Sequence, residues 1–560
     1  MEKQRAGRVK TGASKAGIIL RMIVLALNLP ALAGGIAYIV HPTPYLFWNL
    51  YGFVIFLALF GGIALAGFGG THRYLDYCYL LLNTIGMLLI PVMNTLASSD
   101  VQNKTSQNIF VVILYNAIFL LAAVSACLRI KYDLANRNPG FERKTQAQSG
   151  GSGNAIRWIA VILLCTILLF GVFLSYILLG HSTGNMIEVF IPEYAIFWGF
   201  LVLSASILII KLRWRNKGSV FNKIVLAFGI IIYAICMIPF ASTPFMIRNA
   251  DAAFREAFGE TINEQPEFMR SPFSLQNYFF GTRTHDYIVR ENVLYYEGTA
   301  GVDTGIRLHF DAYMPAADGG NPQSRNPVLI RIHGGAWVLG DKGFSNYSET
   351  NKHFVNLGYV VFDIQYGLND RNTSYMTFAS SRAPASVKGN FDIDDMVRHI
   401  GIFTAYLAGH AGEYGADLNS VFISGASAGG QLAIASALGI TGGKYTNILD
   451  SRLRVRGLIP FYPANSLSPS VGIGGTPDLV DPAALVGEDS PPCLIYHGTH
   501  DGIVNPKYAS ILQKAYEDKS GAPCALLWMN FAGHGSDFYT PGYYSQIFMY
   551  YMERFMYRYR

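Results

Sequence analysis

A serine, an aspartate and a histidine occur in this order within three short motifs in the C-terminal half of the chain. Ser427 lies in the run Gly-Ala-Ser-Ala-Gly-Gly at 425–430. Asp501 ends the run His-Gly-Thr-His-Asp at 497–501, and His534 lies between two glycines. A serine hydroxyl becomes a strong nucleophile when a histidine takes its proton and a carboxylate orients that histidine. These residue types can therefore carry out acyl transfer through a covalent intermediate.

The serine motif is informative only together with its surroundings. At a strand-to-helix turn, Gly-x-Ser-x-Gly exposes the serine on a sharp bend, and the next backbone N–H, that of Ala428, can bind a developing negative charge. A glycine-rich turn before a packed helix is the structural alternative. Asp501 beside a glycine also fits an Asx turn. His500 is a second candidate base, although His534 fits the order Ser, Asp, His better.

A further set of backbone donors lies earlier in the chain. The run His-Gly-Gly-Ala-Trp at 333–337 follows a predicted strand. Successive glycines let the backbone approach a ligand closely. The N–H groups of Gly334 and Gly335 can then hold the oxyanion that forms when an acyl carbon becomes tetrahedral. A tight turn without function is the alternative for this run.

The elements that must position these motifs alternate between short apolar strands and longer helical segments. This pattern predicts a mostly parallel sheet covered by helices on both faces. Strands are predicted over 287–296, 307–314, 328–333, 360–365, 421–424, 457–462, 493–497 and 525–530. Helices are predicted over 348–357, 393–410, 428–438, 506–518 and 543–557. Each motif then falls at or directly after the end of a strand.

With these motifs in this order, residues 285–560 resemble the α/β-hydrolase superfamily, in its carboxylesterase branch of hormone-sensitive-lipase-like and feruloyl-esterase-like proteins. The resemblance implies Ser427 as nucleophile, His534 as base and Asp501 as its partner. It also implies oxyanion contacts from Gly334, Gly335 and Ala428. Two departures concern the substrate pocket: Tyr-Gly-Leu stands at 366–368 where many relatives have Tyr-Arg-Leu, and the stretch 369–390 is long and irregular.

The first half of the chain differs in composition from the second half. The chain of 560 residues is 51% hydrophobic and only 14% charged, whereas soluble domains carry about 25% charged residues. Residues 1–245 hold 19 Lys and Arg against seven Asp and Glu, and residues 246–560 hold 24 against 30. A basic and apolar half indicates a membrane with anionic lipid. Neither half is both basic and polar, which excludes nucleic-acid binding, and the hydrophobicity excludes a disordered chain.

Seven segments are long and apolar enough to cross a membrane. They lie at about 17–40, 46–69, 75–97, 108–128, 156–180, 189–210 and 221–245. With a cytoplasmic N-terminus, the inner segments carry 18 Lys and Arg and the outer loops only Lys104. The positive-inside rule favours this orientation. The odd number of spans then places the C-terminal domain outside the cytoplasm, at the plasma membrane.

The predicted fold is therefore an N-terminal α-helical transmembrane bundle of about seven spans followed by an α/β-hydrolase domain with a mostly parallel sheet. The predicted boundaries are 1–245 for the bundle, 246–284 for a connector near the membrane and 285–560 for the hydrolase domain. Asp76, Glu188 and Glu193 lie near predicted helix ends rather than at mid-membrane. An anchor or lipid-facing platform is favoured over an ion-coupled transporter for this reason.

Other sites receive less support. Asp392, Asp394 and Asp395 resemble a metal cluster, but carboxylates at the start of a helix are also favoured by its dipole. No metal or cofactor is predicted. Cys493 and Cys524 begin neighbouring strands, where disulfide geometry is seldom available, and whether they pair stays open. The sequence does not predict the oligomeric state.

The leading hypothesis is a membrane-anchored serine hydrolase that cleaves a carboxylic ester and needs no cofactor. Its substrate would be a small-molecule, lipid or acylated-glycan ester. A peptidase or amidase on the same scaffold is the first alternative, because the same three residues serve both reactions. The second is a transporter or sensor whose outer domain only binds a ligand.

Overall fold

The protein is described here from a computed structural model. The residues it describes are 15–40, 46–68, 72–102, 109–135, 153–180, 184, 186–213, 219–261, 265, 268–282, 287–316, 325–346, 348–371 and 383–560.

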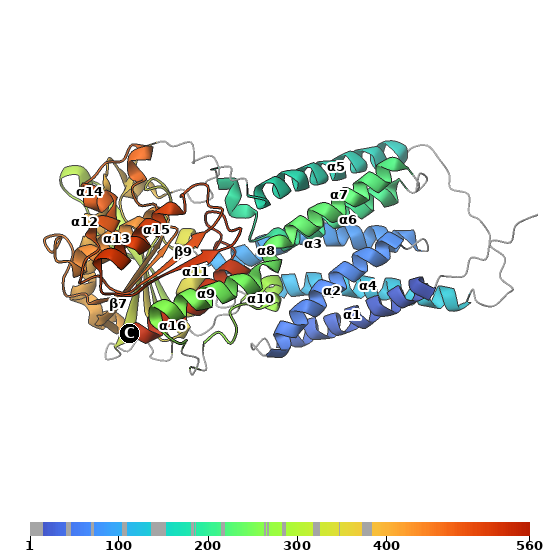
Figure 1. Ribbon diagram of the computed structural model, residues 1–560, viewed down its shortest axis with the longest axis horizontal. Coiled ribbons are helices and arrows are strands. Elements are labelled where there is room, and N and C mark those ends of the chain that lie inside the picture. The colour runs from blue at the N-terminus through green and yellow to red at the C-terminus, as the bar shows by residue number, and fades with distance from the viewer. Residues whose placement is uncertain are drawn as a thin grey trace, which may run out of the picture. The chain divides into compact units, whose positions relative to one another are not determined.

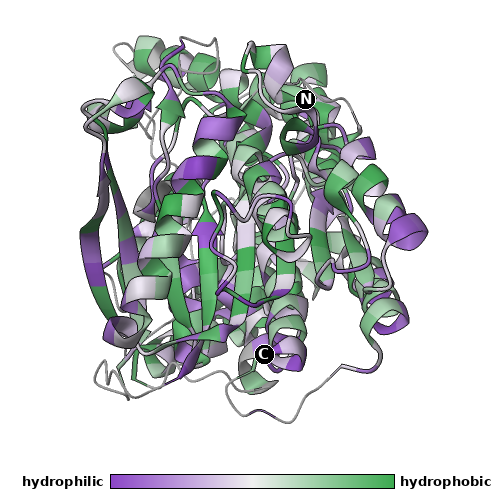
Figure 2. Ribbon diagram, turned by 90° about the vertical axis from the view of Figure 1, so that its left-hand side faces the viewer, coloured by the Kyte–Doolittle hydropathy of each residue, from purple (hydrophilic) through white to green (hydrophobic). Residues whose placement is uncertain are grey.

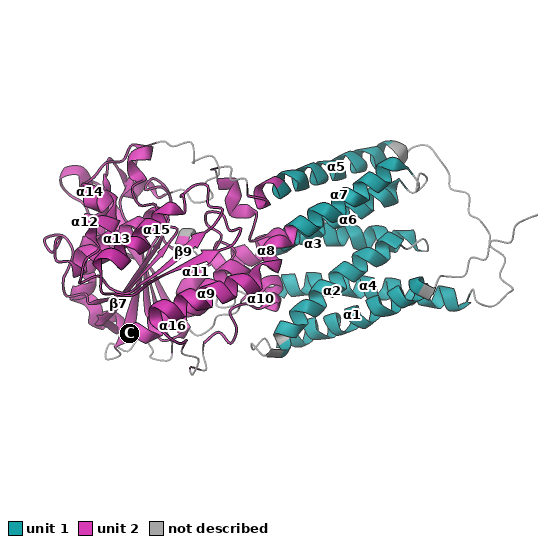
Figure 3. Ribbon diagram, in the orientation of Figure 1, with its two compact units in different colours: residues 1–90, 109–175, 196–235 teal, residues 91–108, 176–195, 236–560 magenta. Residues whose placement is uncertain are grey.

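The chain forms two compact units (Figure 3). The first, a helical unit, comprises residues 1–90, 109–175 and 196–235. The second, an α/β unit, comprises residues 91–108, 176–195 and 236–560. Two stretches that connect apolar helices, 91–108 and 176–195, therefore belong to the α/β unit.

Long apolar helices build the first half of the chain (Figure 1). They are α1 (Lys15–Val40), α2 (Leu46–Phe68), α3 (Arg73–Ser99), α4 (Ile109–Ala135), α5 (Gly153–Leu178), α6 (Ala195–Leu212) and α7 (Val220–Cys236). Among the described residues, six of these helices, α1 to α6, are long and apolar enough to cross a membrane. All but four of the large hydrophobic side chains exposed in the described part of the chain lie at or before Phe245. This N-terminal region is therefore membrane-embedded.

Two predicted span boundaries are wrong. The sixth span was expected to begin at residue 189, but α6 begins at Ala195, after Pro192. The seventh was expected to run to residue 245, but α7 ends at Cys236. Pro239 and Pro244 follow, and each begins a new helix, because proline lacks the N–H that continues one. These helices are α8 (Ile238–Ala241) and α9 (Thr243–Phe258).

A buried ion cluster lies inside the helical unit. Asp76 in the first turn of α3 pairs with Arg129 of α4 and with Lys211 of α6, whose Nζ lies 2.8 Å from Asp76 Oδ2. All three side chains are almost completely buried. A buried charge needs a partner, so this cluster joins three helices that are distant in the sequence.

An eight-stranded sheet forms the centre of the α/β unit, in the order β1-β2-β4-β3-β7-β8-β9-β10. The β1–β2 and β2–β4 pairs are antiparallel and the other pairs are parallel. All eight predicted strands are confirmed: β1 (Tyr287–Glu297), β2 (Arg307–Pro315), β3 (Asn326–Ile332), β4 (Val360–Ile364), β7 (Ala416–Ala426), β8 (Val455–Phe461), β9 (Cys493–Gly498) and β10 (Cys524–Met529). A small separate sheet pairs β5 (Leu368–Asn369) with β6 (Lys388–Gly389).

Helices cover both faces of the large sheet (Figure 1). They are α9, α11 (Ser348–Asn356), α12 (Ile393–His410), α13 (Ala428–Thr441), α15 (Lys507–Lys519) and α16 (Tyr543–Tyr559). Two short helices, α10 (Leu275–Phe280) and α14 (Pro477–Val480), belong to the same unit. Val421 and Ile423 of β7 join one core cluster with α12 and α13. Phe422, which points to the other face, packs against Phe555 of α16. The inner strands are accordingly mostly apolar (Figure 2).

Candidate active site

The turn between β7 and α13 carries Ser427 in a backbone conformation that few residues adopt. Its φ is 56° and its ψ is −120°. Glycines permit the close packing around this bend. A β-carbon on Gly425 would lie 2.2 Å from the carbonyl oxygen of Gly429, and one on Gly429 would lie 2.3 Å from that of Ile332. The flanking glycines are thus required sterically, and the hydroxyl is presented at the carboxyl end of the sheet.

The structure brings Ser427, His534 and Asp501 together. His534 Nε2 lies 3.0 Å from Ser427 Oγ, and His534 Nδ1 lies 2.8 Å from Asp501 Oδ2. His534 follows β10 and Asp501 follows β9, and these strands are parallel neighbours. Their ends therefore meet at one edge of the sheet. This arrangement allows a proton to pass from the hydroxyl to the imidazole while the carboxylate holds the ring.

Asp501 is buried, and both oxygens of its carboxylate have polar partners. Its Oδ1 accepts hydrogen bonds from the backbone N–H groups of Ile503 (3.0 Å) and Val504 (2.8 Å). His497 Nε2 lies 3.4 Å from its other oxygen. Burial opposes ionisation, but the charge and hydrogen bonds of His534 and His497 outweigh it and lower the pKa of Asp501. The side chain is therefore a carboxylate at neutral pH.

The glycine loop after β3 lies against the serine turn. A β-carbon on Gly334 would lie 3.2 Å from Ser427 Cβ and 2.7 Å from the carbonyl oxygen of Ala426. The next residues continue in left-handed conformations, with φ of 118° at Gly335 and 62° at Trp337. Trp337 Nε1 donates to Gln431 Oε1 of α13 at 3.0 Å. The loop and the start of α13, where Ala428 lies, are thereby joined.

His333 holds the start of this loop in place. Its Nδ1 donates to the carbonyl oxygen of Gly334 at 2.8 Å, and its ring stacks on Tyr366 at 4.5 Å. The Tyr366 hydroxyl donates to the carbonyl oxygen of His333 at 3.0 Å. Burial lowers the pKa of His333 to about 4. The imidazole is therefore neutral at pH 7 and acts as a hydrogen-bond donor rather than as a charge.

The glycine at position 367, where many relatives have arginine, has a steric explanation. A β-carbon at this position would lie 2.5 Å from Cε1 of His399, which projects from α12. The Gly367 N–H donates to His399 Nδ1 at 3.2 Å, and His399 Nε2 lies 3.0 Å from Asp303 Oδ1. The arginine of many relatives has no room here. Of the irregular stretch 369–390, residues 372–382 lie outside the described residues.

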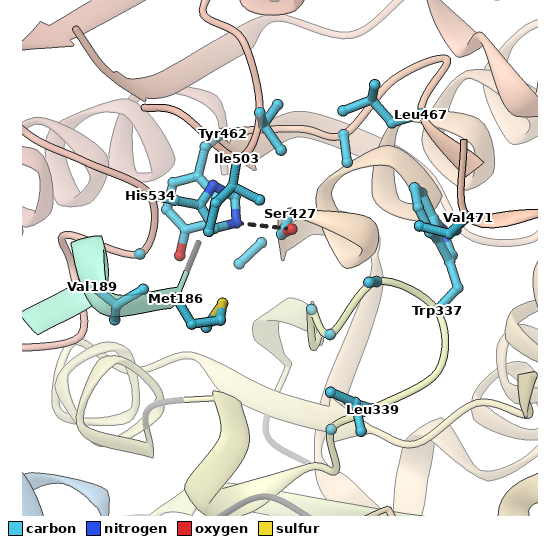
Figure 4. Close-up of a pocket in the computed structure, with 18 of the residues that line it drawn as sticks. Met186, Val189, Trp337, Leu339, Ser427, Tyr462, Leu467, Val471, Ile503 and His534 are labelled. Atoms are coloured by element: carbon cyan, nitrogen blue, oxygen red, sulfur yellow. Dashed lines mark hydrogen bonds between the residues drawn. The ribbon is translucent and has the colours of Figure 1, made fainter. Parts of the chain in front are cut away.

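A cavity of about 210 Å³ opens over Ser427 (Figure 4). Its lining includes Gly334, Gly335 and His534, so the glycine loop and the base face the same space as the serine. Apolar side chains complete the walls: Met186, Val189, Trp337, Leu339, Leu467, Val471, Ile503 and Val504. The space suits a neutral substrate with apolar groups on either side of a polar centre.

Sequence reasoning missed two contributors to this site. Tyr462, directly after β8, lies with its ring 4.5 Å from that of His534 and donates its hydroxyl to Asp537 at 2.6 Å. Its position at a strand end, like those of the three motifs, was the available signal. Met186 and Val189 belong to the stretch between α5 and α6 and carry no motif that points to this cavity.

The other residues considered from the sequence lie outside this cavity. His500 Nδ1 lies 2.8 Å from Thr499 Oγ1 and its ring packs on Phe531, and it is not among the described residues that line the cavity. Asp392 and Asp395 form a capping box at the start of α12. In the described part of the chain no three His, Cys, Asp or Glu side chains are grouped as a metal site.

Cys493 and Cys524 lie opposite each other on β9 and β10 as free thiols.

Parts of this chain are similar to known proteins. Residues 310–467 match the BD-FAE family model. The matched segment runs from β2 to the loop that follows β8. It is 24% identical over 233 residues to the probable carboxylic ester hydrolase LipM of Mycobacterium tuberculosis (strain ATCC 25618 / H37Rv), covering 38% of this chain and 49% of that protein. It is also 24% identical over 237 residues to esterase LipQ of the same organism, covering 39% and 52%. The chain thus spans about half the length of these relatives.

Two solved structures align with part of the chain. Thermogutta terrifontis esterase 2 phosphonylated by cyclosarin aligns with a TM-score of 0.35 and 23% identity, over 44% of this chain and 84% of that one. A truncated carbohydrate esterase from gut microbiota aligns with a TM-score of 0.36 and 18% identity, over 48% and 96%.

Proposed function

We propose that this protein is a membrane-anchored serine hydrolase that cleaves carboxylic esters. The observation that carries the proposal is the hydrogen-bonded chain from Ser427 Oγ through both nitrogens of His534 to Asp501, at 3.0 and 2.8 Å. It opens into a cavity that the glycine loop also lines. We assign residues 285–560 to the hydrolase domain and residues 246–284 to a connector near the membrane.

In the first half of the reaction, Ser427 Oγ attacks the ester carbonyl while His534 takes its proton. The N–H groups of Gly334, Gly335 and Ala428 stabilise the oxyanion. Asp501 keeps the His534 tautomer and stabilises the imidazolium. The carbon–oxygen bond to the alcohol then breaks, and His534 returns the proton to the departing oxygen. Water, activated by the same histidine, hydrolyses the acyl-enzyme and releases the acid.

Ester cleavage is favoured over the alternatives for two reasons. The relatives are named as carboxylic ester hydrolases and esterases, which supports an ester rather than a peptide or amide substrate. A protein that only binds a ligand has no need of a serine, histidine and aspartate in hydrogen-bond contact. A small-molecule, lipid or glycan ester can each present the acyl group that this chemistry requires.

An extracytoplasmic position of the domain is supported by the two connecting stretches in the α/β unit. Residues 91–108 and 176–195 join α3 to α4 and α5 to α6, and both pack with residues 236–560. Val101, for example, accepts a hydrogen bond from the Tyr287 hydroxyl at 2.7 Å. The domain then lies on the same side of the membrane as these outer loops. This requires α7 to cross the membrane back again, as a seventh span.

The decisive experiment compares Ser427→Ala with the parent protein in detergent, on p-nitrophenyl esters from acetyl to long acyl chains. The expected loss of kcat is at least about a thousandfold, because the nucleophile is removed. Ser451→Ala, at an exposed serine on the same unit, is the matched control and should keep full activity. Stoichiometric labelling by a fluorophosphonate should likewise occur in the parent and in Ser451→Ala but not in Ser427→Ala.

Ester hydrolysis that persists unchanged in Ser427→Ala would reject the serine mechanism. Folded protein with no activity on any ester, but with activity on an anilide of the same acid, would favour the amidase alternative.

A further inference from the structure

The stretch between α5 and α6 packs against the turns that carry the reacting residues. Within it, Met186–Phe190 forms a short 3-10 helix, η1. A β-carbon on Gly533 would lie 3.3 Å from Glu188 Cβ, and one on Gly535 would lie 3.3 Å from Val189 Cγ1. Two consecutive residues of η1 therefore contact the glycines on either side of His534.

Glu188 fixes this contact at the Asp501 turn. Its Oε2 accepts the N–H of Gly502 at 3.1 Å, and its Oε1 accepts the N–H of Gly184 at 2.7 Å. The residue is 1% exposed. A buried carboxylate that receives backbone hydrogen bonds on both oxygens is held firmly. The stretch is thus attached to the residue that follows Asp501 as well as to the loop of His534.

The carboxyl-terminal end of the stretch is attached to the same unit. The hydroxyl of Tyr543 in α16 donates to the carbonyl oxygen of Pro192. The hydroxyl of Tyr278 in α10 donates to that of Glu193 at 2.9 Å. With anchors on both sides of η1, Met186 and Val189 form a fixed wall of the cavity rather than a mobile cover.

The chemistry of ester cleavage distinguishes the two sides of this cavity. His534 must give its Nε2 proton to the departing alcohol oxygen, so the alcohol lies on the His534 side of Ser427. Met186 and Val189 lie on that side (Figure 4). Trp337, Leu467 and Val471 lie on the other side of Ser427 (Figure 4). The acyl group, which stays bound to the serine after the alcohol departs, would lie on this side.

We infer that the α5–α6 connection forms the binding wall for the alcohol half of the ester, with Met186 and Val189 as specificity-determining residues. This inference rests on the proposed serine mechanism. A connection between two apolar helices would then contribute directly to substrate choice. Neither residue takes part in bond making: the proton passes from Ser427 to His534 to the alcohol oxygen, and the wall only selects which alcohol fits.

Two ester series separate the halves of the substrate. The first varies the alcohol in ethyl, butyl and octyl acetate, with the released acetic acid titrated at constant pH. The second varies the acyl chain in p-nitrophenyl acetate, butyrate and octanoate. Met186→Ala widens the wall and should raise the kcat/KM ratio of octyl to ethyl acetate about tenfold, whereas Met186→Trp should lower it by a similar factor. The acyl ratio, octanoate to acetate, should change less than about twofold in both variants.

Val471→Ala on the opposite wall is the reciprocal control and should change the acyl ratio but not the alcohol ratio. The inference is overturned if the Met186 variants change both ratios equally, or neither. If Ser427→Ala loses activity but the Met186 variants keep the kcat/KM ratios of the parent protein, only the inference about the alcohol-binding wall is rejected. Retained activity in Ser427→Ala would reject the serine mechanism itself.

Discussion

The imidazole of His333 is a buried neutral group between the sheet and the glycine loop. It donates to the Gly334 carbonyl and stacks on Tyr366. Because burial lowers its pKa from 6.5 to about 4, the unfolded chain binds a proton at a higher pH than the folded chain does. Above pH 6.5 both states are neutral and the group has no effect on pH dependence. Between pH 6.5 and 4 the unfolded state binds more protons, so stability falls as pH falls.

The free energy of unfolding of the α/β unit should therefore decrease by up to about 3 kcal/mol over this pH range through His333 alone. His333→Asn keeps a donor near Nδ1 but does not titrate, and should flatten the change. The measurement is the urea concentration that halves p-nitrophenyl acetate hydrolysis at pH 7 and at pH 4.5. His410→Asn, at a half-buried histidine at the end of α12, is the control. A pH dependence in His333→Asn equal to that of the parent would contradict this role.

At the scale of elements, the order of strands and helices followed from local pattern. The strands are short apolar runs, and those in the middle of the sheet are buried on both faces, so their lengths were readable. The helix boundaries that were wrong, at α6 and α7, lie next to Pro192 and Pro239, where apolar composition continues after the helix has ended. Hydropathy alone therefore overestimated both spans.

The packing of α12 on the segment after β4 depends on the absence of a side chain at Gly367. Gly367→Ala would place a β-carbon 2.5 Å from His399 Cε1, and overpacking of this kind costs about 1–3 kcal/mol. Gly487→Ala is the matched control, because a β-carbon there has no described heavy atom within 4 Å. The urea midpoint should fall in the first variant and stay unchanged in the second. Equal midpoints would show that α12 shifts freely to make room.

At the scale of the whole molecule, membrane topology follows from charge and span number. The segments that we predict to be cytoplasmic hold 18 Lys and Arg, and those that we predict to lie outside hold one. The α/β unit includes two of the connections predicted to lie outside. A reporter enzyme that is active only outside the cytoplasm should be active when fused after Arg560. The same reporter fused between α6 and α7, after residue 216, should be inactive. Activity in the second fusion only would reverse the predicted orientation.

The three candidate reacting residues of this protein could be predicted from the sequence by itself. Ser427, Asp501 and His534 each lie in a short motif at or just after a strand end, and parallel strands bring their ends to one edge of a sheet. The charge difference between the halves and the apolar lengths of the helices likewise depend only on local composition. For these features no long-range contact had to be known.

Only the tertiary structure decided what surrounds the reacting atoms. Met186 and Val189 lie more than 200 residues before Ser427 in the chain. Their short helix η1 is held at the cavity by contacts of Glu188 with Gly533 and Gly502 and of Val189 with Gly535. The neutral state of His333 depends on burial by distant segments. Such contacts arise when the whole chain packs, and neither residue spacing nor hydropathy period records them.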